Sequence, residues 1–386
     1  MKPVWMILAL CLAGGSEAAP HRPAADGEVL ERLPTPGPDR RELRELRGAV
    51  ATHPDRPDLA FGLARRYIRQ GRAEADPRWY GHAEAVLEPW LKAGAAHPEA
   101  LLLRATIRQN RHAFGDALAD LDAALAAKPR LSEAWLTRAA ILEAQGDYPG
   151  ALKSCLGVGR GSAAFAATVC LESALGLAGQ AEAAYGRLAP MLAAAPDAEQ
   201  RAWAGGILAE LAERLDRAAE AEARYRAALR EAPRSPYLLA AYADFLLDRG
   251  RPAEAAALLE GETRADPLLL RLALAEQALG IATFAEHASI LKARFEASRA
   301  RGDTSHQGDE ARYALRISNE PARALALAEA NWAVQREPRD ARILLEAAAA
   351  AGHTDVAAEV AGFLARTGLE DARLRRLLAV APGRQT

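Results

Sequence analysis

Apolar residues between positions 98 and 160 recur every three or four residues, in segments of about a dozen residues that end near glycine or proline. This periodicity is typical of amphipathic helices. The pattern also repeats: the segment that begins at Pro98 aligns with the one that begins at Ser132, 34 residues later, and a further copy begins at Pro236. Two helices and two turns fill such a spacing. The sequence therefore predicts an all-α protein of stacked antiparallel helix pairs.

Small and turn-forming residues occupy fixed positions within each copy. Alanines recur where the two helices of a pair would touch, because a small side chain lets them approach closely. A glycine separates the helices, since it tolerates the left-handed conformation that ends the first one, and a proline stops the second. In the copy that begins at Ser132, these positions are filled by Trp135, Ala139, Gly146, Tyr148 and Ala151. In the copy that begins at Pro98, His112 replaces the glycine.

This order of bulky, small, glycine and proline positions resembles the tetratricopeptide repeat. The resemblance implies a right-handed α-solenoid, the tetratricopeptide superhelix, whose concave groove is lined by the first helices and binds a protein or peptide. It also implies groove-binding candidates at equivalent repeat positions, namely Phe61, Arg65, Arg69, Gln109, Asn110, Glu143, Trp203, Tyr237 and Asp244. The basic candidates precede the acidic ones along the chain, and this gradient could orient an extended peptide.

Further helices are predicted on both sides of these copies from the same periodicity and from glycine and proline spacing. Before them, we expect a lone helix over 40–52 and a pair over 58–72 and 82–96. After them, we expect pairs over 268–280 and 284–301, 309–318 and 322–336, and 340–352 and 355–367, then a capping helix over 370–380. The predicted domains are a solenoid of about six to seven units over 39–309, the last divergent, and variant C-terminal units with the capping helix over 310–386.

Residues 1–18 have the layout of a secretory signal peptide, because Lys2 precedes an apolar run that small residues follow. The run of about eleven apolar residues is too short to cross a bilayer, which needs about 20. The bulky Leu10 before Cys11 argues against a lipoprotein. We expect cleavage after Ala18, a proline-rich leader over 19–38, and export of a mature chain without a transmembrane segment to the bacterial periplasm.

Cys155 and Cys170 are the cysteines that would remain after cleavage. The repeat places them on the second helix of one pair and the first helix of the next, which are neighbours in space. They could form a disulfide in an oxidising compartment, or they could be two small buried hydrophobic side chains. The sequence leaves both alternatives open.

Charge and motifs argue against several classes of function. The chain carries 49 Lys+Arg and 51 Asp+Glu, and its net charge of −2 argues against a nucleic-acid-binding protein. Residues 157–162 are glycine-rich but lack the lysine of a phosphate-binding loop, and the eight histidines show no metal-ligand spacing. No nucleophile elbow is found either. We therefore expect no enzyme activity, no cofactor and no metal site.

Export, repeats and missing catalytic motifs together predict a non-enzymatic scaffold for protein–protein interactions in the bacterial cell envelope. Its partner is expected to be a protein or peptide that binds along the concave groove. The alternative is an accessory factor for the assembly or maturation of an envelope enzyme or transporter. The sequence leaves the partner's identity and the oligomeric state open.

Overall fold

The computed structural model describes residues 38–74, 76–92, 96–161 and 163–380. The predicted signal peptide (1–18) and all but the last residue of the predicted leader (19–38) lie outside these residues. The chain divides into two compact units, residues 1–45 and 46–386. The first unit is described only from residue 38, where helix α1 (Pro38–Thr52) begins. The second unit contains the core and the candidate site.

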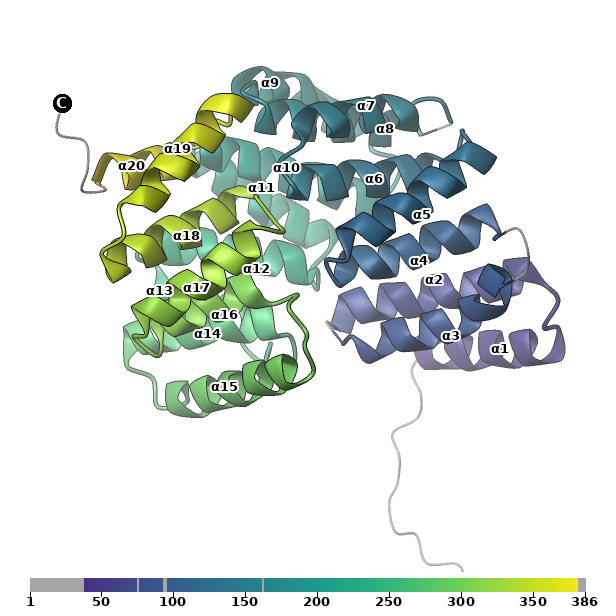
Figure 1. The fold of residues 1–386 in the computed structure, drawn as a ribbon, viewed down its shortest axis with the longest axis horizontal. Helices are drawn as coiled ribbons and strands as arrows, with labels where there is room; N and C mark the ends of the chain where they lie inside the picture. Colours follow the sequence, from purple (N-terminus) through teal and green to yellow (C-terminus); the bar gives the residue numbers. More distant parts are fainter. Residues whose placement is uncertain (1–37, 75, 93–95, 162, 381–386) are drawn as a thin grey trace, which may run out of the picture. The chain divides into compact units, whose positions relative to one another are not determined.

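The second unit is a succession of helices joined by turns (Figure 1), and no strand occurs among the described residues. After α1 its α-helices are α2 (Pro57–Glu74), α3 (Arg78–Lys92), α4 (Pro98–Asn110), α5 (Phe114–Ala127), α6 (Ser132–Ala144), α7 (Tyr148–Val158), α8 (Ala164–Leu177), α9 (Ala181–Met191), α10 (Ala198–Arg214), α11 (Ala218–Glu231), α12 (Pro236–Asp248), α13 (Pro252–Leu258), α14 (Asp266–Leu279), α15 (Phe284–Ala300), α16 (Gln307–Arg316), α17 (Pro321–Trp332), α18 (Pro338–Ala351), α19 (Asp355–Thr367) and α20 (Ala372–Val380). The all-α repeat fold predicted from the sequence is confirmed. Within the described part of the chain, no helix is both long and apolar enough to span a membrane.

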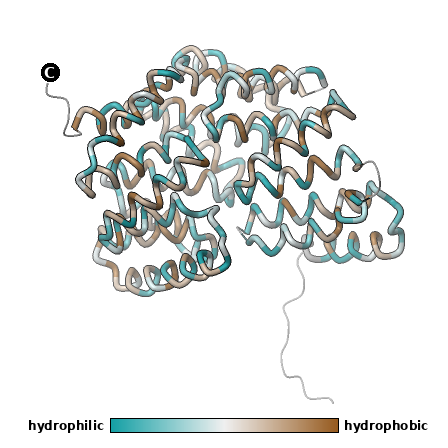
Figure 2. Tube along the Cα trace, in the orientation of Figure 1, coloured by the Kyte–Doolittle hydropathy of each residue, from teal (hydrophilic) through white to brown (hydrophobic). Residues whose placement is uncertain are grey.

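The helices of the second unit pack in two layers. Consecutive helices such as α4 and α5, or α6 and α7, pack as pairs. The first helix of each pair also contacts the first helix of the next, from α2 through α4, α6 and α8 to α10, and again from α12 through α14 and α16 to α18. Hydrophobic and polar residues alternate along many of the helices (Figure 2), as expected where a helix buries one face. The first helices thus form one layer and the second helices the other.

Alanine lies at the predicted contact positions between paired helices. Ala139 of α6 is 1% exposed, and Ala151 of α7 is fully buried. Ala105 and Ala117 are likewise fully buried in the pair of α4 and α5. Because alanine has only a methyl group, the two helix backbones can approach closely without leaving a void.

The turn between α4 and α5 shows how a residue other than glycine is accommodated. Gly146 has φ 76° at the equivalent turn after α6, and His112 adopts φ 56° after α4. A left-handed conformation costs an L-residue about 1–2 kcal/mol. The His112 ring is held by a 3.1 Å contact from the Gln335 amide to its Nε2. Burial, with a smaller contribution from nearby Arg339, lowers the pKa of His112 to about 4, so the neutral ring can accept this hydrogen bond.

Helix α3 begins four residues before the predicted start at residue 82. The reason is aromatic packing at the start of α3. Trp79 stacks on Tyr67 with ring centroids 5.8 Å apart. Tyr80 lies against Gly71, where an added Cβ would come within 2.9 Å of its ring. This packing makes residues 78–81 the first turn of the helix, ahead of the start that the sequence predicts.

The C-terminal helices return to the middle of the stack. The backbone N–H of Arg336, between α17 and α18, donates to the carbonyl of Ala144 at the end of α6, at 2.7 Å. The ring of Phe363 on α19 lies edge-on to Tyr148 of α7, with centroids 6.4 Å apart. Tyr148 therefore belongs to the same hydrophobic core as buried residues of α16 to α20. Helices distant in sequence share one core, which repeat stacking alone does not predict.

Two turn glycines allow this close approach. A Cβ on Gly179, whose φ is 86°, would lie 2.7 Å from the carbonyl oxygen of Gly368. A Cβ on Gly146 would lie 2.7 Å from the ring of Phe363. Both glycines therefore serve two purposes, since they end a first helix and also make room for the returning C-terminal helices.

A disulfide joins α7 to α8. The Sγ atoms of Cys155 and Cys170 are bonded, and both residues are buried, at 0% and 3% exposure. A bond that closes a loop of this length contributes about 3 kcal/mol by restricting the unfolded chain. The bond thus links two successive helix pairs covalently near the middle of the stack.

We predict that Gly179→Ala destabilises the protein more than Gly250→Ala does. Both glycines have positive φ, 86° and 68°, so both substitutions incur a similar backbone strain of about 1–2 kcal/mol. Only at Gly179 does the added methyl group meet another part of the chain, because no atom lies within 4 Å of a Cβ on Gly250. Urea unfolding should show an additional loss of about 1–2 kcal/mol for Gly179→Ala. Equal losses would contradict the close contact with Gly368.

Candidate functional site

An arginine connects the first helices at the N-terminal end of the stack. Arg65 of α2 donates to Glu99 of α4 at 2.9 Å and to Glu133 of α6 at 2.6 Å. Arg69, about one turn further along α2, is exposed to solvent. Of these two predicted groove residues, Arg65 stabilises the surface itself and Arg69 presents its charge to solvent.

Phe61 does not lie on the groove surface, which corrects the expectation from the repeat alignment. Its side chain is 3% exposed. The ring packs against Trp90 of α3 and against His97, with centroid distances of 5.6 Å and 4.8 Å. Phe61 therefore contributes to the core between α2, α3 and the start of α4.

Gln109 and Asn110 lie half-buried at the end of α4. The Asn110 amide donates to the carbonyl of Thr106 at 2.6 Å, and its oxygen accepts from the Tyr80 hydroxyl at 3.0 Å. Asn110 thus ties α4 to α3. Both hydrogen bonds of the Asn110 side chain are made within this chain, so they form without a bound partner protein.

Two exposed aromatic side chains lie on the first helices in the middle of the stack. Trp203 of α10 is 36% exposed and Tyr237 of α12 is 52% exposed, whereas other aromatic side chains of these helices, such as Phe245, are buried. The Tyr237 hydroxyl donates to Glu210 of α10. Trp203 and Glu210 are two turns apart on α10 and so share one face of it. The three side chains form a surface that we call the aromatic shelf.

Carboxyl groups crowd together beside the aromatic shelf. Glu143 of α6 accepts from the Ser173 hydroxyl at 3.2 Å. Burial, reinforced by the negative charges of Glu337 and Glu210, raises the pKa of Glu143 to about 8. Burial also raises the pKa of Glu210, and Glu337 adds to this shift. Carboxylates from α6, α10 and the start of α18 therefore face a common space.

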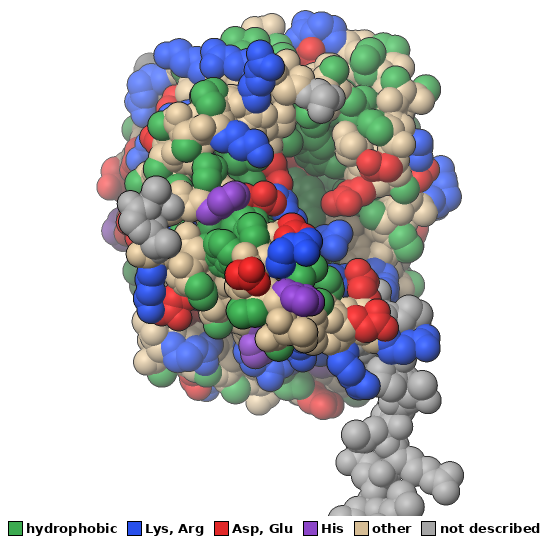
Figure 3. All heavy atoms as spheres, turned by 90° about the vertical axis from the view of Figure 1, so that its right-hand side faces the viewer, with side chains coloured by type: hydrophobic (Ala, Val, Ile, Leu, Met, Phe, Trp, Pro, Cys, Tyr) green, Lys and Arg blue, Asp and Glu red, His purple; other side chains and the backbone are tan. Residues whose placement is uncertain are grey.

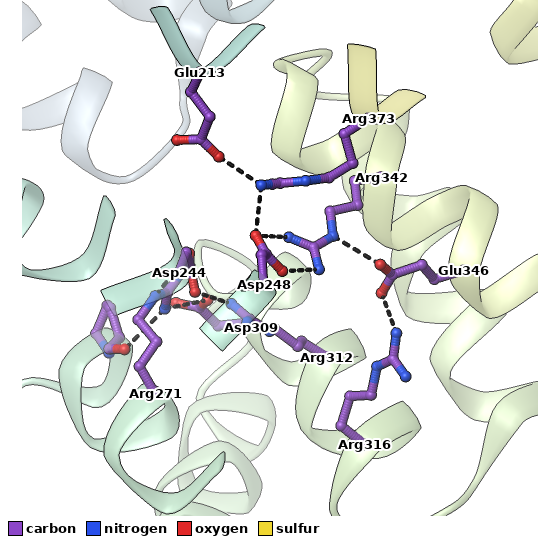
Figure 4. Close-up of polar contacts among 11 residues, drawn as sticks. Glu213, Asp244, Asp248, Arg271, Asp309, Arg312, Arg316, Arg342, Glu346 and Arg373 are labelled. Atoms are coloured by element: carbon purple, nitrogen blue, oxygen red, sulfur yellow. Dashed lines mark hydrogen bonds and ion pairs between the residues drawn. The ribbon is translucent and has the colours of Figure 1, made fainter. Parts of the chain in front are cut away.

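An ion-pair network crosses the first helices at the C-terminal end of the stack (Figure 4). Arg271 of α14 is 5% exposed and bonds Asp244 of α12 at 2.8 Å and Asp309 of α16 at 3.1 Å. Arg312 of α16 also donates to Asp244, at 2.5 Å. Although burial acts in the opposite direction, these two arginines hold the pKa of Asp244 well below its usual range. The predicted groove residue Asp244 is thus occupied by contacts within the chain.

A second part of the network joins the C-terminal helices to the middle of the stack. Arg342 of α18 forms a fork on Asp248 of α12, at 2.6 and 2.9 Å, and also bonds Glu346 at 2.7 Å. Arg373 of α20 bonds Asp248 at 2.6 Å and Glu213 of α10 at 2.5 Å. Figure 4 shows Asp248 between the two arginines. One carboxylate of α12 therefore holds two helices that follow much later in the sequence.

Sequence reasoning missed the arginines of this network. Arg342 bonds a residue 94 positions away, and Arg373 bonds one 160 positions away. Such distances exceed the repeat period, so alignment of neighbouring copies carries no signal for them. Arg271 has a weak signal, because a charged residue at a helix position that should be buried calls for a buried partner.

The first helices offer a surface with exposed aromatic and half-buried acidic side chains. No group of three or more His, Cys, Asp or Glu side chains in the described part of the chain could hold a metal ion. One face of the molecule is hollowed, with hydrophobic side chains in its depth and acidic side chains at its edge (Figure 3). Concave surfaces lined by apolar groups with a few polar groups are common binding sites in proteins.

The helix pairing and turn positions described above resemble those of the tetratricopeptide repeat. No family model matches the sequence, and no curated protein matches it either. Among solved structures, the chain is similar to a tetratricopeptide repeat protein from Parabacteroides merdae, with 14% identity, coverage of 75% of this chain and 98% of that chain, and a TM-score of 0.37. It is also similar to the TPR domain of P58(IPK), with 15% identity, coverage of 82% and 94%, and a TM-score of 0.21. Likenesses this distant carry no information on function.

We predict that Asp244→Asn lowers the free energy of unfolding at pH 7 by about 3 kcal/mol, because the buried Arg271 loses one of its two carboxylate partners. The pKa of Asp244 is lower in the folded state than in the unfolded state. The contribution of the Asp244 carboxylate to the free energy of unfolding is therefore complete above the unfolded-state pKa of about 3.9, and it is lost as the pH falls toward the folded-state pKa. The difference in the free energy of unfolding between wild type and variant should therefore become smaller below about pH 4. Urea unfolding across this pH range measures both effects.

Asp216→Asn is the matched control for this prediction. Asp216 pairs with Arg376 at 3.0 Å, and both side chains are more than half exposed. An exposed pair contributes at most about 1 kcal/mol. Asparagine also tolerates the φ of 61° found at this position. A loss for Asp244→Asn no larger than that of the control would contradict the role of the network.

Proposed function

We propose that this protein is a non-enzymatic scaffold that binds a segment of a partner protein along the surface of its first helices, with the aromatic shelf at the centre of the contact. The exposure of Trp203 and Tyr237 carries the proposal. Tryptophan and tyrosine dominate the binding energy of many protein interfaces. Two such side chains on neighbouring helices, left uncovered by their own chain, are therefore the best candidates for anchoring a partner.

Ion pairs along the first helices support this proposal. Arg65, Arg271 and Arg342 each bond carboxylates on other first helices or within their own helix. These bonds hold the first helices at a set spacing before any partner arrives. A surface that needs little rearrangement loses less entropy when it binds.

We further propose that the scaffold acts in the bacterial cell envelope. Two features support this location. The first 18 residues have the layout of a signal peptide, and the chain contains a disulfide between Cys155 and Cys170. Disulfides persist in oxidising compartments such as the periplasm and are rare in the reducing cytosol.

The experiment is capture of a partner from crosslinked envelope extract by the tagged protein and by a Trp203→Ala/Tyr237→Ala variant. We expect a dominant partner that the variant retains at no more than about a tenth of the wild-type amount, as expected when anchors worth about 1.4 kcal/mol or more are removed. The control is Leu156→Ala/Met191→Ala, which removes exposed hydrophobic side chains from the second helices α7 and α9 and should capture normally. Equal capture by wild type and both variants would contradict binding at the aromatic shelf.

A further inference from the structure

The space beside the aromatic shelf holds carboxyl groups that no basic side chain in the described part of the chain pairs with. Glu143 and Glu210 come from α6 and α10, and Glu337 is the residue that caps the start of α18. Within the described residues, no basic side chain lies within ion-pair distance of Glu143 or Glu210. These two carboxyl groups are only half-buried, so solvent reaches them. The space therefore lacks a cation at the place where carboxyl groups converge.

The two arginines nearest to these carboxyl groups do not neutralise them. Arg339 of α18 is 60% exposed and forms its ion pair with Glu337. Arg214 of α10 is 8% exposed and has one hydrogen bond, from Nη1 to the carbonyl of Gly176 at 3.3 Å. Each lies close enough to influence the pKa of Glu210, but neither bonds it. The shortage of positive charge thus persists although two guanidinium groups are near.

Two buried polar groups near this space also lack a hydrogen-bond partner among the described residues. The Nε of Arg214 is buried and has no partner among the described residues, and neither has the hydroxyl of Tyr148, whose side chain is 1% exposed. Tyr148 lies within electrostatic reach of Arg214, Glu143 and Glu337, so it is near the same carboxyl groups. Buried polar groups in native proteins are almost always paired. Two unpaired groups beside an acidic space indicate that something bound there, or water held there, completes them.

The chemistry of the occupant follows from these three features. It must bring a positive charge to Glu143 and Glu210, an acceptor oxygen toward Arg214, and a flat or extended apolar part to cover Trp203 and Tyr237. An arginine side chain stacks on aromatic rings and forms forked hydrogen bonds with carboxylates. The backbone that carries it supplies carbonyl oxygens as acceptors.

We propose that the space bounded by Glu143, Glu210, Tyr237 and the start of α18 is a subsite for an arginine side chain in an extended segment of the partner protein. This proposal rests on the proposed scaffold function and specifies the partner that it selects. The guanidinium lies over the aromatic shelf and bonds Glu210 and Glu143. Partners that offer a neutral or acidic residue at this position are bound more weakly, since they leave the carboxyl groups uncompensated.

The test compares two blocked peptides, acetyl-GSARASG-amide and the same peptide with citrulline in place of arginine. Citrulline has nearly the same shape and is neutral, so the comparison isolates the charge. Calorimetry with the full oxidised chain at pH 7, up to about 5 mM peptide, should show roughly tenfold tighter binding of the arginine peptide. Equal affinity, or no binding of the arginine peptide over this range, would overturn the subsite.

Variants assign the preference to the named carboxyl groups. Glu143→Gln/Glu210→Gln should reduce the arginine preference to about twofold or less, while Glu88→Gln, on the second helix α3, should leave it unchanged. Circular dichroism confirms that each variant is folded. The arginine preference of wild type stands as evidence even if the double variant fails to fold. Retention of the full preference in a folded double variant would place the cation elsewhere and overturn the assignment.

The peptide test and the capture experiment can fail separately. Loss of the captured partner in the Trp203→Ala/Tyr237→Ala variant, together with equal binding of both peptides, would keep the scaffold function and reject the arginine subsite. An arginine preference that depends on Glu143 and Glu210, together with unchanged capture, would keep the subsite and reject the aromatic shelf as the anchor for that partner.

Discussion

The carboxylate of Asp248 on α12 accepts bonds from Arg342 of α18 and Arg373 of α20, and the position of the C-terminal helices depends on this contact (Figure 4). These C-terminal helices lie against the middle of the stack. Because they return, the start of α18 brings Glu337 and Arg339 to face Glu143 and the aromatic shelf. The acidic space is thus formed by residues from both halves of the chain.

Two different kinds of interaction hold the stack and its return. Neighbouring pairs are held by close-packed alanine and leucine side chains, such as Ala139 and Leu142. Burial of these side chains stabilises the stack but has no preferred direction, so it does not by itself select one arrangement of the helices. The return combines a small shared core around Tyr148 and Phe363 with forked arginine–carboxylate bonds. Charged pairs of this kind gain little net free energy after desolvation, but they are satisfied in only one geometry. They therefore determine where the C-terminal helices lie more than they add to total stability.

Much of this fold could be predicted from the sequence, because the repeat is a local feature. The 34-residue spacing, the buried Ala151 and the left-handed Gly146 all follow from contacts within one pair or between neighbours. The placement of Cys155 and Cys170 on adjacent helices follows from the same register, although the register alone does not distinguish a disulfide from packing. Contacts between residues far apart in the sequence, such as the hydrogen bond from Arg336 to Ala144, produce no periodic pattern in the sequence, so the sequence does not predict them.

The same distinction between local repeat features and long-range contacts applies to the candidate site. Trp203 and Tyr237 are exposed where the repeat alignment places groove residues, while Phe61 is buried because its ring packs against Trp90 and His97. Asp244 lies on the expected layer but is bonded by two arginines of the network. Position in the repeat thus identifies the layer. Which side chains remain open depends on long-range pairing that only the structure shows.

The most direct test of this account is the hydrogen exchange of one amide. The backbone N–H of Arg336 donates to the carbonyl of Ala144 at 2.7 Å, and this bond exists only while the C-terminal helices lie against α6. Exchange should be followed by mass spectrometry with single-residue resolution on the full oxidised chain in native buffer. The account predicts protection comparable to that of amides inside α6 and α18. Exchange of the Arg336 amide at the rate of an unstructured peptide, with α6 and α18 still protected, would contradict the return of the C-terminal helices.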